Sequence, residues 1–391
     1  MSPKTPFWLT ILLAGLFLSA CSPAATSTPV ASLPEPSLTP PPTATLPTPQ
    51  AVPVRLAWFY KPPADGNLQL VAQKFNFFIL SKGDEPERDQ LLALGAKQPI
   101  LQYVRFDAIM DPGSCTRQPW QNNAAFLPGD FCKISAEHPD WFLLDQNSQR
   151  ILETYGGETF ALMDPGNPGW RAFFLERLRQ TQEADPKWGG VFLDNVEATS
   201  VRHERKKRFL PAYPLESDYQ AAIQGFLRYL RTSYFQPRGR LLFANLIARR
   251  DEADWLQSIP YLDGVMHEGW AIDWPNGYRS PEVWAEQMTL AEATQAEGKL
   301  IVLVSQGKPE DQELQQFAYA SYLLINQGQA VFRFANSKAY NQAWLYDNYQ
   351  LDLGAALGPR YPQGEAWRRD FTRGYVLVNP VTHAVEIHSN P

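Results

Sequence analysis

The stretch Gly190-Val191-Phe192-Leu193-Asp194-Asn195 is a short apolar run that ends abruptly in a carboxylate. A similar pattern recurs further along the chain as Asp263-Gly264-Val265-Met266-His267-Glu268. A buried strand that delivers an acid at its C-terminal end is typical of the functional face of an α/β barrel. We therefore predict that Asp194 and Glu268 end two barrel strands and point toward the same mouth.

Further runs of the same kind flank these two. Near-continuous apolar segments are typical of strands buried on both faces, as in parallel sheets. The segments fall at residues 55–60, 75–80, 99–104, 190–194, 240–245, 264–268, 299–304 and 329–334.

Helical patterns fill the gaps between these runs. Asn167-Pro168 and Ser280-Pro281 each place a capping side chain before a proline at the first helical position. Tyr219, Ile223, Phe226 and Leu230 recur on one helical face, and residues 314–325 carry a comparable pattern. Eight strands alternating with helices predict an α/β fold of the (β/α)8 TIM-barrel type.

Two insertions and a tail interrupt this regularity. Residues 107–163 form a long, loop-like excursion after the third strand, and residues 195–217 follow the fourth. Both are expected on the barrel face that carries the acids, where long loops build a cleft. The segments 374–380 and 384–387 predict a small C-terminal β appendage. The expected domains are therefore a barrel over residues 54–340 and an extension packed on it over residues 341–391.

The N-terminus carries targeting signals. Residues 1–20 contain Lys4 and an apolar run, Phe7 to Leu18, that is too short to span a bilayer. Leu18-Ser19-Ala20-Cys21 resembles the lipobox of bacterial lipoproteins, which implies cleavage before Cys21 and lipidation of its sulfur. The alternative is a plain secretory signal with a chance cysteine. Lipidation predicts an extracytoplasmic protein, anchored to the membrane at the cell surface or envelope.

Residues 21–53 comprise the lipidated cysteine and a tether rich in Pro, Thr and Ser. This segment lacks apolar periodicity and cannot bury a core. In polyproline geometry it would reach on the order of 100 Å, so the folded domain is expected to stand off the membrane.

Composition narrows the classes of partner. The 391 residues carry 35 basic against 41 acidic side chains, which argues against a general nucleic-acid binder. Cys115 and Cys132 are expected to form a disulfide in an oxidising compartment. The five histidines show no metal-ligand spacing. We therefore expect no metal and no cofactor, and a monomer as the working form.

Two acids on two strands are what cleavage of a glycosidic bond requires. Asp194 is the candidate nucleophile or base, and Glu268 the candidate general acid. Met266 and Trp270 would supply an apolar wall that raises the pKa of Glu268. The competing interpretation is structural: Asp194 caps a helix or pairs with an arginine, and Glu268 forms a salt bridge. Asp164 and Glu197 are second-rank acids that could replace either one.

Other polar and aromatic residues also stand at predicted strand ends. A ring of such side chains around one mouth favours a hydrogen-bonding sugar site. The basic run Arg202 to Arg208 follows Asp194 and is either solvated surface or a binding site for an acidic glycan or a membrane headgroup. With the acids, the predicted substrate-binding residues are Trp58, Tyr60, Tyr103, Arg105, Asp164, Asn195, Glu197, Asn245, Trp270, Gln306 and Arg333.

Three short motifs carry a family resemblance. They are Leu162-Met163-Asp164-Pro165-Gly166-Asn167-Pro168-Gly169-Trp170-Arg171, Val191 to Glu197, and Gly374 to Pro380. With them the chain, over roughly residues 54–387, resembles the hypothetical glycoside hydrolases of the family 15 type. These are similar in turn to endo-α-1,4-polygalactosaminidase barrels. The resemblance implies a TIM barrel with one acid on the fourth strand, here Asp194, and another on the sixth, here Glu268.

These patterns predict a surface lipoprotein that hydrolyses O-glycosidic bonds of an extracellular poly- or oligosaccharide. The alternative is a non-catalytic glycan-binding lipoprotein, which would use the same cleft and would release no reducing ends. A transporter-associated solute receptor would instead show two α/β lobes joined by a hinge, which the continuous strand pattern does not suggest.

Overall fold

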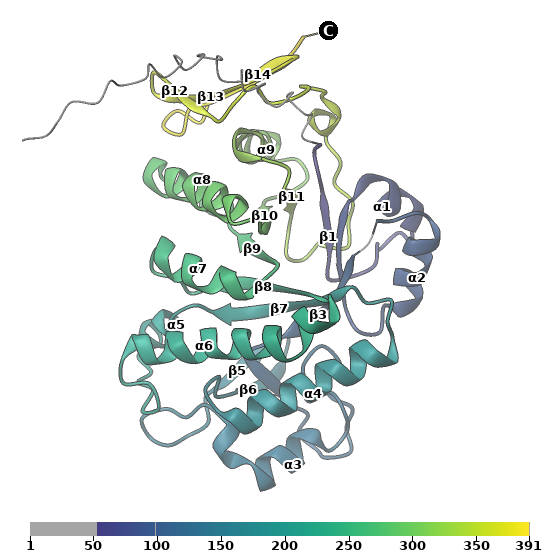
Figure 1. Cartoon of the computed structure of the whole chain (residues 1–391), viewed down its shortest axis with the longest axis vertical. Helices are drawn as coiled ribbons and strands as arrows, with labels where there is room; N and C mark the ends of the chain where they lie inside the picture. The colour runs from purple at the N-terminus through teal and green to yellow at the C-terminus, as the bar shows by residue number, and fades with distance from the viewer. Residues whose placement is uncertain (1–52, 98, 391) are drawn as a thin grey trace, which may run out of the picture. The chain divides into compact units, whose positions relative to one another are not determined.

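The computed structural model describes residues 53–97 and 99–390. The predicted signal peptide, Cys21 and nearly all of the tether lie outside this part of the chain. The described residues form an eight-stranded parallel sheet surrounded by helices, with two smaller antiparallel sheets (Figure 1). Within them, no helix combines the length and apolar character needed to cross a bilayer.

All neighbouring strands of the large sheet pair in parallel, and its order is β1-β2-β3-β7-β8-β9-β10-β11. A bridge between Leu56 and Phe332 brings the two outermost strands together, so the sheet is nearly closed into a barrel. The strands are β1 (Ala57–Phe59), β2 (Phe77–Leu80), β3 (Ile100–Arg105), β7 (Gly190–Glu197), β8 (Leu241–Ile247), β9 (Gly264–Glu268), β10 (Leu300–Gln306) and β11 (Ala330–Ala335). Each predicted strand corresponds to one of these.

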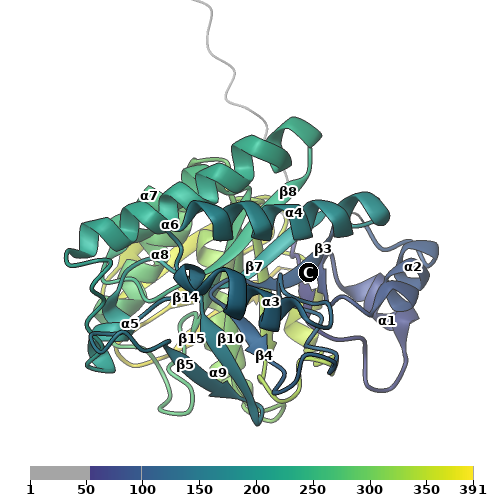
Figure 2. The ribbon, with the colours of Figure 1, turned by 90° about the horizontal axis from the view of Figure 1, so that it is seen from below.

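Helices connect successive strands and cover the outside of the sheet. In Figure 2, α4, α6 and α7 lie side by side across one flank. The connecting helices are α1 (Leu68–Lys74), α2 (Glu85–Ala93), α4 (Pro168–Ala184), α6 (Glu216–Leu230), α7 (Glu252–Ser258), α8 (Pro281–Ala296) and α9 (Gln312–Ile325). The short helix α5 (Val201–Arg205) lies in the connection after β7. The predicted alternation of strands and helices is therefore confirmed.

Two helix starts follow the predicted capping chemistry. The Asn167 side chain accepts hydrogen bonds from the backbone N–H groups of Gly169 and Trp170 at the start of α4. The Ser280 hydroxyl accepts from the N–H of Val283 at the start of α8. Each bond satisfies a helix-end donor that has no partner within the helix.

Side chains fill the barrel interior rather than leaving a pore. One apolar cluster lies inside the sheet and a larger one lies between sheet and helices. Because side chains alternate along a strand, each strand contributes every second residue to the interior. The inner set includes Ala57, Phe59, Phe77, Ile79, Leu101, Tyr103, Phe192, Phe243, Met266, Val302, Val304 and Val331.

The excursion at residues 107–163 is more ordered than the sequence suggested. It contains the antiparallel sheet β4-β6-β5 and one helix, which Figure 1 draws at the end of the molecule away from the C-terminal sheet. The elements are β4 (Ala108–Asp111), α3 (Asp130–Glu137), β5 (Leu152–Tyr155) and β6 (Glu158–Leu162). These strands were not predicted from the sequence. They are short, and β5 has no buried residue that would give it an apolar pattern.

Two local features hold this insertion together. Gly156 and Gly157 both have positive φ between β5 and β6, as a tight type I′ hairpin turn requires. A disulfide joins Cys115 to Cys132, the latter on helix α3. The Asp130 carboxylate of α3 also pairs with Arg177 of α4, which ties the insertion to the barrel's outer layer.

The C-terminal appendage is a four-stranded antiparallel sheet that packs against α9. Buried Arg369 donates hydrogen bonds to the carbonyls of Leu323 and Asn326 at the end of that helix, where carbonyls lack helical partners. The strands are β12 (Tyr361–Gln363), β13 (Ala366–Phe371), β14 (Gly374–Val378) and β15 (Val385–Ser389).

Candidate active site

Asp194 and Glu268 lie in one cleft at the C-terminal ends of the barrel strands. Phe192 and Met266 belong to the inner apolar layer, and the two acids stand two residues further along the same strands. Since successive side chains of a strand point to opposite faces, both carboxylates point to the inside of the barrel. Both line a cavity of about 870 Å³, which is within the size range of small-molecule binding sites.

One amide joins the two carboxylates. Asn245 is two residues beyond the inward-facing Phe243, and its Nδ2 donates to Asp194 Oδ1 at 3.0 Å and to Glu268 Oε2 at 3.1 Å. Two bonds of these lengths from one nitrogen place the two acceptor oxygens no more than 6.1 Å apart. The side chains therefore converge closely enough to act on one small group between them.

Asp194 is surrounded by hydrogen-bond donors. Besides Asn245, the Tyr103 hydroxyl donates to Oδ2 at 2.5 Å and the backbone N–H of Asn195 to Oδ1 at 3.0 Å. These three donors fix the position of the Asp194 carboxyl in the cleft. Asn195 itself has φ of +60° at an irregularity in the pairing of β7. In this left-handed conformation, the backbone N–H of Asn195 points toward the carboxylate of Asp194.

The environment of Glu268 differs from that of Asp194. Burial, followed by the nearby negative charge of Asp194, raises the pKa of Glu268 to about 7. The Asn245 amide and the Tyr340 hydroxyl, which donates to Oε1 at 3.4 Å, oppose that rise. Two carboxyls in different environments, one with a raised pKa, are the pattern expected of an acid and its partner in catalysis.

Three tyrosines wall the acids. The ring of Tyr60 lies edge-on to Tyr103 at 5.1 Å and to Tyr340 at 5.3 Å. Burial, together with the nearby acids, raises the pKa of all three hydroxyls, so they remain donors at neutral pH. Tyr60 has φ of +79° directly after β1, an uncommon conformation for a bulky residue. Phe59 already points to the inside of the barrel, so regular alternation would point Tyr60 outward. The positive φ of Tyr60 changes its direction, and its ring lines the cleft.

The structure brings several of the predicted site residues together. Asn245 bridges the two acids but is itself almost fully buried. The predicted residues that line the cleft with the acids are Tyr60, Tyr103, Arg105, Asn195 and Gln306. Gln306 donates to the Tyr340 hydroxyl at 3.3 Å, and Arg105 pairs with Asp107.

Three other predicted residues lie outside the cleft lining. Trp58 follows inward-facing Ala57 and so points outward, where its ring packs against Phe75. Trp270 is fully buried, with its indole N–H donated to the carbonyl of Ala318, so it forms no wall beside Glu268. Arg333 donates to backbone carbonyls, including that of Gln342, beneath the cleft. We assign these residues to packing.

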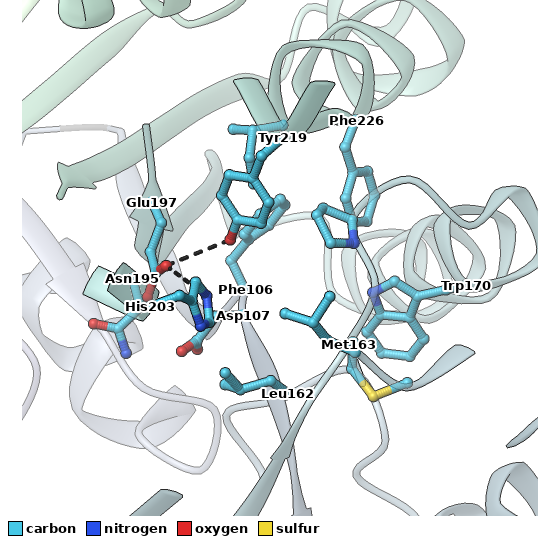
Figure 3. A pocket seen from close by; sticks show the side chains of 13 residues that line it. Phe106, Asp107, Leu162, Met163, Trp170, Asn195, Glu197, His203, Tyr219 and Phe226 are labelled. Atoms are coloured by element: carbon cyan, nitrogen blue, oxygen red, sulfur yellow. Dashed lines mark hydrogen bonds and ion pairs between the residues drawn. The ribbon is translucent and has the colours of Figure 1, made fainter. Parts of the chain in front are cut away.

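The second-rank acids also lie outside the cleft. Glu197 is buried beside a separate cavity of about 10 Å³, which is too small for a sugar ring (Figure 3). Its carboxylate lies 3.2 Å from His203 Nε2 and accepts from the Tyr219 hydroxyl and from Arg202. Asp164 lies just before α4. Its carboxylate accepts hydrogen bonds from the N–H of Gly166 and from the Tyr213 hydroxyl.

Part of the basic run after β7 pairs with an acid of the insertion. Arg202, Lys206 and Arg208 converge on the Glu153 carboxylate. These contacts lower the pKa of Glu153 despite its burial. These three residues therefore brace the insertion strand β5 against the barrel, while Arg205 and Lys207 of the same run are exposed.

Several residues of the cleft lining were not anticipated from the sequence, and two of them are aromatic residues near the acids. Tyr340 follows the last barrel strand in an irregular loop, and Trp120 lies in the insertion. Neither belongs to a periodic pattern, so no strand-end argument could find them. Among the described residues, no group of three or more acids, histidines or cysteines could hold a metal ion.

The sequence of the chain places it in a known family. The chain belongs to hypothetical glycosyl hydrolase family 15, whose sequence model matches residues 116–375. That span contains both candidate acids and Asn245. No curated protein is significantly similar in sequence to the chain.

Solved structures of glycosidases resemble the chain distantly. The glycoside hydrolase domain of PelA from Pseudomonas aeruginosa matches at 16% identity and a TM-score of 0.49, covering 75% of this chain and 97% of that one. The α-galactosidase TtGalA from Thermus thermophilus matches at 13% identity and a TM-score of 0.45, covering 82% and 66%. A xylosidase from Aspergillus niger matches at 12% identity and a TM-score of 0.44, covering 73% and 45%.

Proposed function

We propose that this protein hydrolyses O-glycosidic bonds of an extracellular polysaccharide through Asp194 and Glu268. The supporting observation is the single amide of Asn245, which donates to both carboxylates inside a cleft of substrate size. Membership of a glycosyl hydrolase family supports the same reaction class. The chemistry requires no cofactor, because the two carboxyls can supply both the proton and the nucleophile.

The two acids take different roles in this proposal. Glu268, whose pKa is raised to about 7, keeps a protonated fraction at neutral pH and donates its proton to the leaving oxygen. Asp194 attacks the anomeric carbon from the other side of the bond. This attack forms a covalent bond between Asp194 and the sugar. Glu268 then removes a proton from a water whose oxygen attacks the anomeric carbon, which breaks the bond to Asp194, releases the sugar and restores both groups.

Separation of the acids favours retention of anomeric configuration. Retaining enzymes hold their carboxyls about 5–5.5 Å apart, whereas inverting enzymes need about 6.5–9.5 Å to admit a water. One pair of their oxygens, joined by Asn245, lies within 6.1 Å, an approach close to the retaining spacing.

Substitution of each acid tests the proposal. Asp194→Asn and Glu268→Gln keep side-chain shape and should each remove most turnover while thermal unfolding stays cooperative. The protein is incubated with cell-wall and exopolysaccharide fractions, and released oligosaccharides are read by mass spectrometry. Full activity in either variant would exclude that residue from the mechanism. If wild-type protein binds a glycan but releases no reducing ends, the glycan-binding alternative replaces hydrolysis.

A separate measurement tests retention. NMR of the first product formed should show the same anomer as the substrate. For Asp194→Ala, added azide should restore bond cleavage and yield a glycosyl azide, because a small anion can occupy the vacated position. Immediate appearance of the opposite anomer would instead indicate inversion.

The cellular site is proposed from the N-terminal sequence. The lipobox-like Leu18-Ser19-Ala20-Cys21 and the Pro/Thr-rich tether support a membrane-anchored lipoprotein that acts outside the cytoplasm. Metabolic labelling with a fatty-acid analogue should mark the wild-type protein and leave Cys21→Ser unlabelled. Equal labelling of both would remove Cys21 as the anchor.

A further inference from the structure

The insertion between β3 and α4 contributes one wall of the cleft, and that wall carries two aromatic side chains close to solvent. Trp120 is half-buried and Tyr155 is 73% exposed. Both line the same cavity as the acids. Trp120 is the only tryptophan in that lining, and Tyr155 is the most exposed of the exposed large hydrophobic side chains in the described part of the chain.

Trp120 lies near the acids. Its ring is 5.9 Å from that of Tyr103, whose hydroxyl donates to Asp194. Phe160 of β6 supports it edge-on from another side, also at 5.9 Å. Its indole N–H makes no hydrogen bond within residues 53–97 and 99–390, and it is not one of their buried unpaired polar atoms. The ring and its donor are therefore available to a molecule in the cleft.

The backbone around Trp120 is fixed before any ligand binds. Its N–H contacts Met110 Sδ at 3.1 Å, and its carbonyl accepts from the Asn123 side chain at 2.6 Å. Two residues later the segment contacts barrel strand β3, where the Asn122 carbonyl accepts a hydrogen bond from the N–H of Arg105 at 2.7 Å. The disulfide from Cys115 anchors the segment on its other side. A ring held in this way loses little conformational entropy on binding.

Tyr155 extends the wall outward. It precedes the Gly156-Gly157 turn at the tip of the β5–β6 hairpin, and Glu158 lies opposite it across that turn. The Glu158 carboxylate pairs with Arg117 in the Trp120 segment. The two aromatic residues thus stand on adjoining segments joined by an ion pair, one beside the acids and one toward the rim.

From this arrangement we propose that Trp120 and Tyr155 form a stacking platform for successive units of a sugar chain. Trp120 receives a unit close to the cleaved bond, and Tyr155 receives a more distant unit. Pyranose rings present apolar C–H faces that pack on aromatic rings, and the exposed Tyr155 would otherwise leave an apolar face in water. This inference rests on the proposed function, since it assumes that the cleft binds a saccharide.

The platform makes chain length the measurable variable. In the Glu268→Gln background, which should bind without turnover, affinity is measured for α-1,4- and β-1,4-linked hexose and hexosamine oligomers of two to eight units. We expect affinity to rise with length up to about six units. Tyr155→Ala should weaken binding of six-unit oligomers about fivefold to tenfold, a typical aromatic contribution, and leave two-unit binding unchanged.

Companion variants separate stacking from folding. Trp120→Ala should weaken binding about tenfold at every length, whereas Trp120→Phe should recover most of the loss because it keeps an aromatic face. Leu152→Ala is the matched control: Leu152 is 50% exposed on the same strand as Tyr155 and lies outside the cleft lining. In the active protein, Tyr155→Ala should raise KM for six-unit oligomers and leave kcat unchanged.

The outcomes distinguish this inference from the proposed function. If Tyr155→Ala binds six-unit oligomers as tightly as its parent, or if no oligomer shows length-dependent binding, the platform is excluded. If wild-type protein cleaves an oligomer while Tyr155→Ala and Trp120→Ala keep its KM, hydrolysis stands and the platform fails. If length-dependent binding is lost in the variants but wild-type protein releases no reducing ends, the platform stands and hydrolysis fails.

Discussion

Asn245 shows how much one side chain can organise at this site. Its amide lies between two acids, so its removal would leave both carboxyls short of a donor in a buried setting. A hydrogen bond to a charged group contributes about 1.5–3 kcal/mol, which corresponds to roughly a 10- to 100-fold change in rate if the loss is felt in the transition state.

We therefore expect Asn245→Ala to lower kcat/KM by roughly 10- to 100-fold. Asn341→Ala, a change to another cleft asparagine that makes no side-chain hydrogen bond to either acid in the described structure, serves as control and should stay near wild type. Initial rates on a defined oligosaccharide provide the measurement. Equal rates for wild type and Asn245→Ala would show that the bridge is dispensable.

The raised pKa of Glu268 predicts an alkaline limb in the pH profile. A general acid works only while protonated, so kcat/KM should fall as pH rises through about 7. The same shift affects stability. Because the folded-state pKa is above the ordinary value, the stabilising contribution of the protonated carboxyl is complete at low pH and is lost as pH rises through about 7.

Two profiles check this prediction. The pH dependence of kcat/KM should show one ionisation near neutrality on the alkaline side. The wild-type unfolding free energy should decline at lower pH, as pH rises from the ordinary carboxyl pKa of 4.5 to about 7, and Glu268→Gln, which cannot ionise, should lack that component of the decline. A flat activity profile up to pH 9 would show that Glu268 is not the proton donor.

At the scale of elements, the cap of α4 tests local chemistry. Asn167 holds two backbone N–H groups at the start of a helix that covers the barrel, and its amide also donates to the carbonyl and carboxylate of Asp140. Asn167→Ala should destabilise the protein by about 1 kcal/mol, and Asn167→Ser, which keeps a capping oxygen and places no charge beside Asp140, should restore part of it. Urea unfolding gives both values. Turnover should not change, because the cap lies outside the cleft lining, and a large loss of turnover would indicate a further role.

Strand alternation explains which predicted site residues reach the cleft. Tyr103, Asp194, Asn245 and Glu268 each continue the inward series of their strand, so a strand-end argument could find them. Trp58 stands one residue out of that series and faces the helices. The sequence of such a strand does not show which residues point inward, because both faces of a parallel strand are buried and every residue is apolar. Only the three-dimensional register reveals it.

At the scale of the whole molecule, the disulfide stabilises the inserted unit internally, and the ion pair between Asp130 and Arg177 ties that unit to the barrel. Cys115 and Cys132 enclose a loop of 17 residues in sequence separation, and closing a loop of about 15 residues stabilises a protein by about 3 kcal/mol in the chain-entropy account. Cys115→Ser with Cys132→Ser should lower Tm and increase hydrogen exchange in residues 117–123. An unchanged Tm in the double variant would show that the ion pair between Asp130 and Arg177 is sufficient to hold the insertion.

The sequence by itself determined the barrel, its strand segments, two helix caps and the two acids at strand ends. These depend on periodicity and on capping chemistry, which act over a few residues. The tertiary structure decided that Asn245 joins the acids, that Tyr340 and Trp120 enter the cleft, and that Glu197 turns into a separate buried cluster. Those contacts join residues far apart in the chain, and their geometry depends on barrel closure and on the fold of the insertion, neither of which leaves a local pattern.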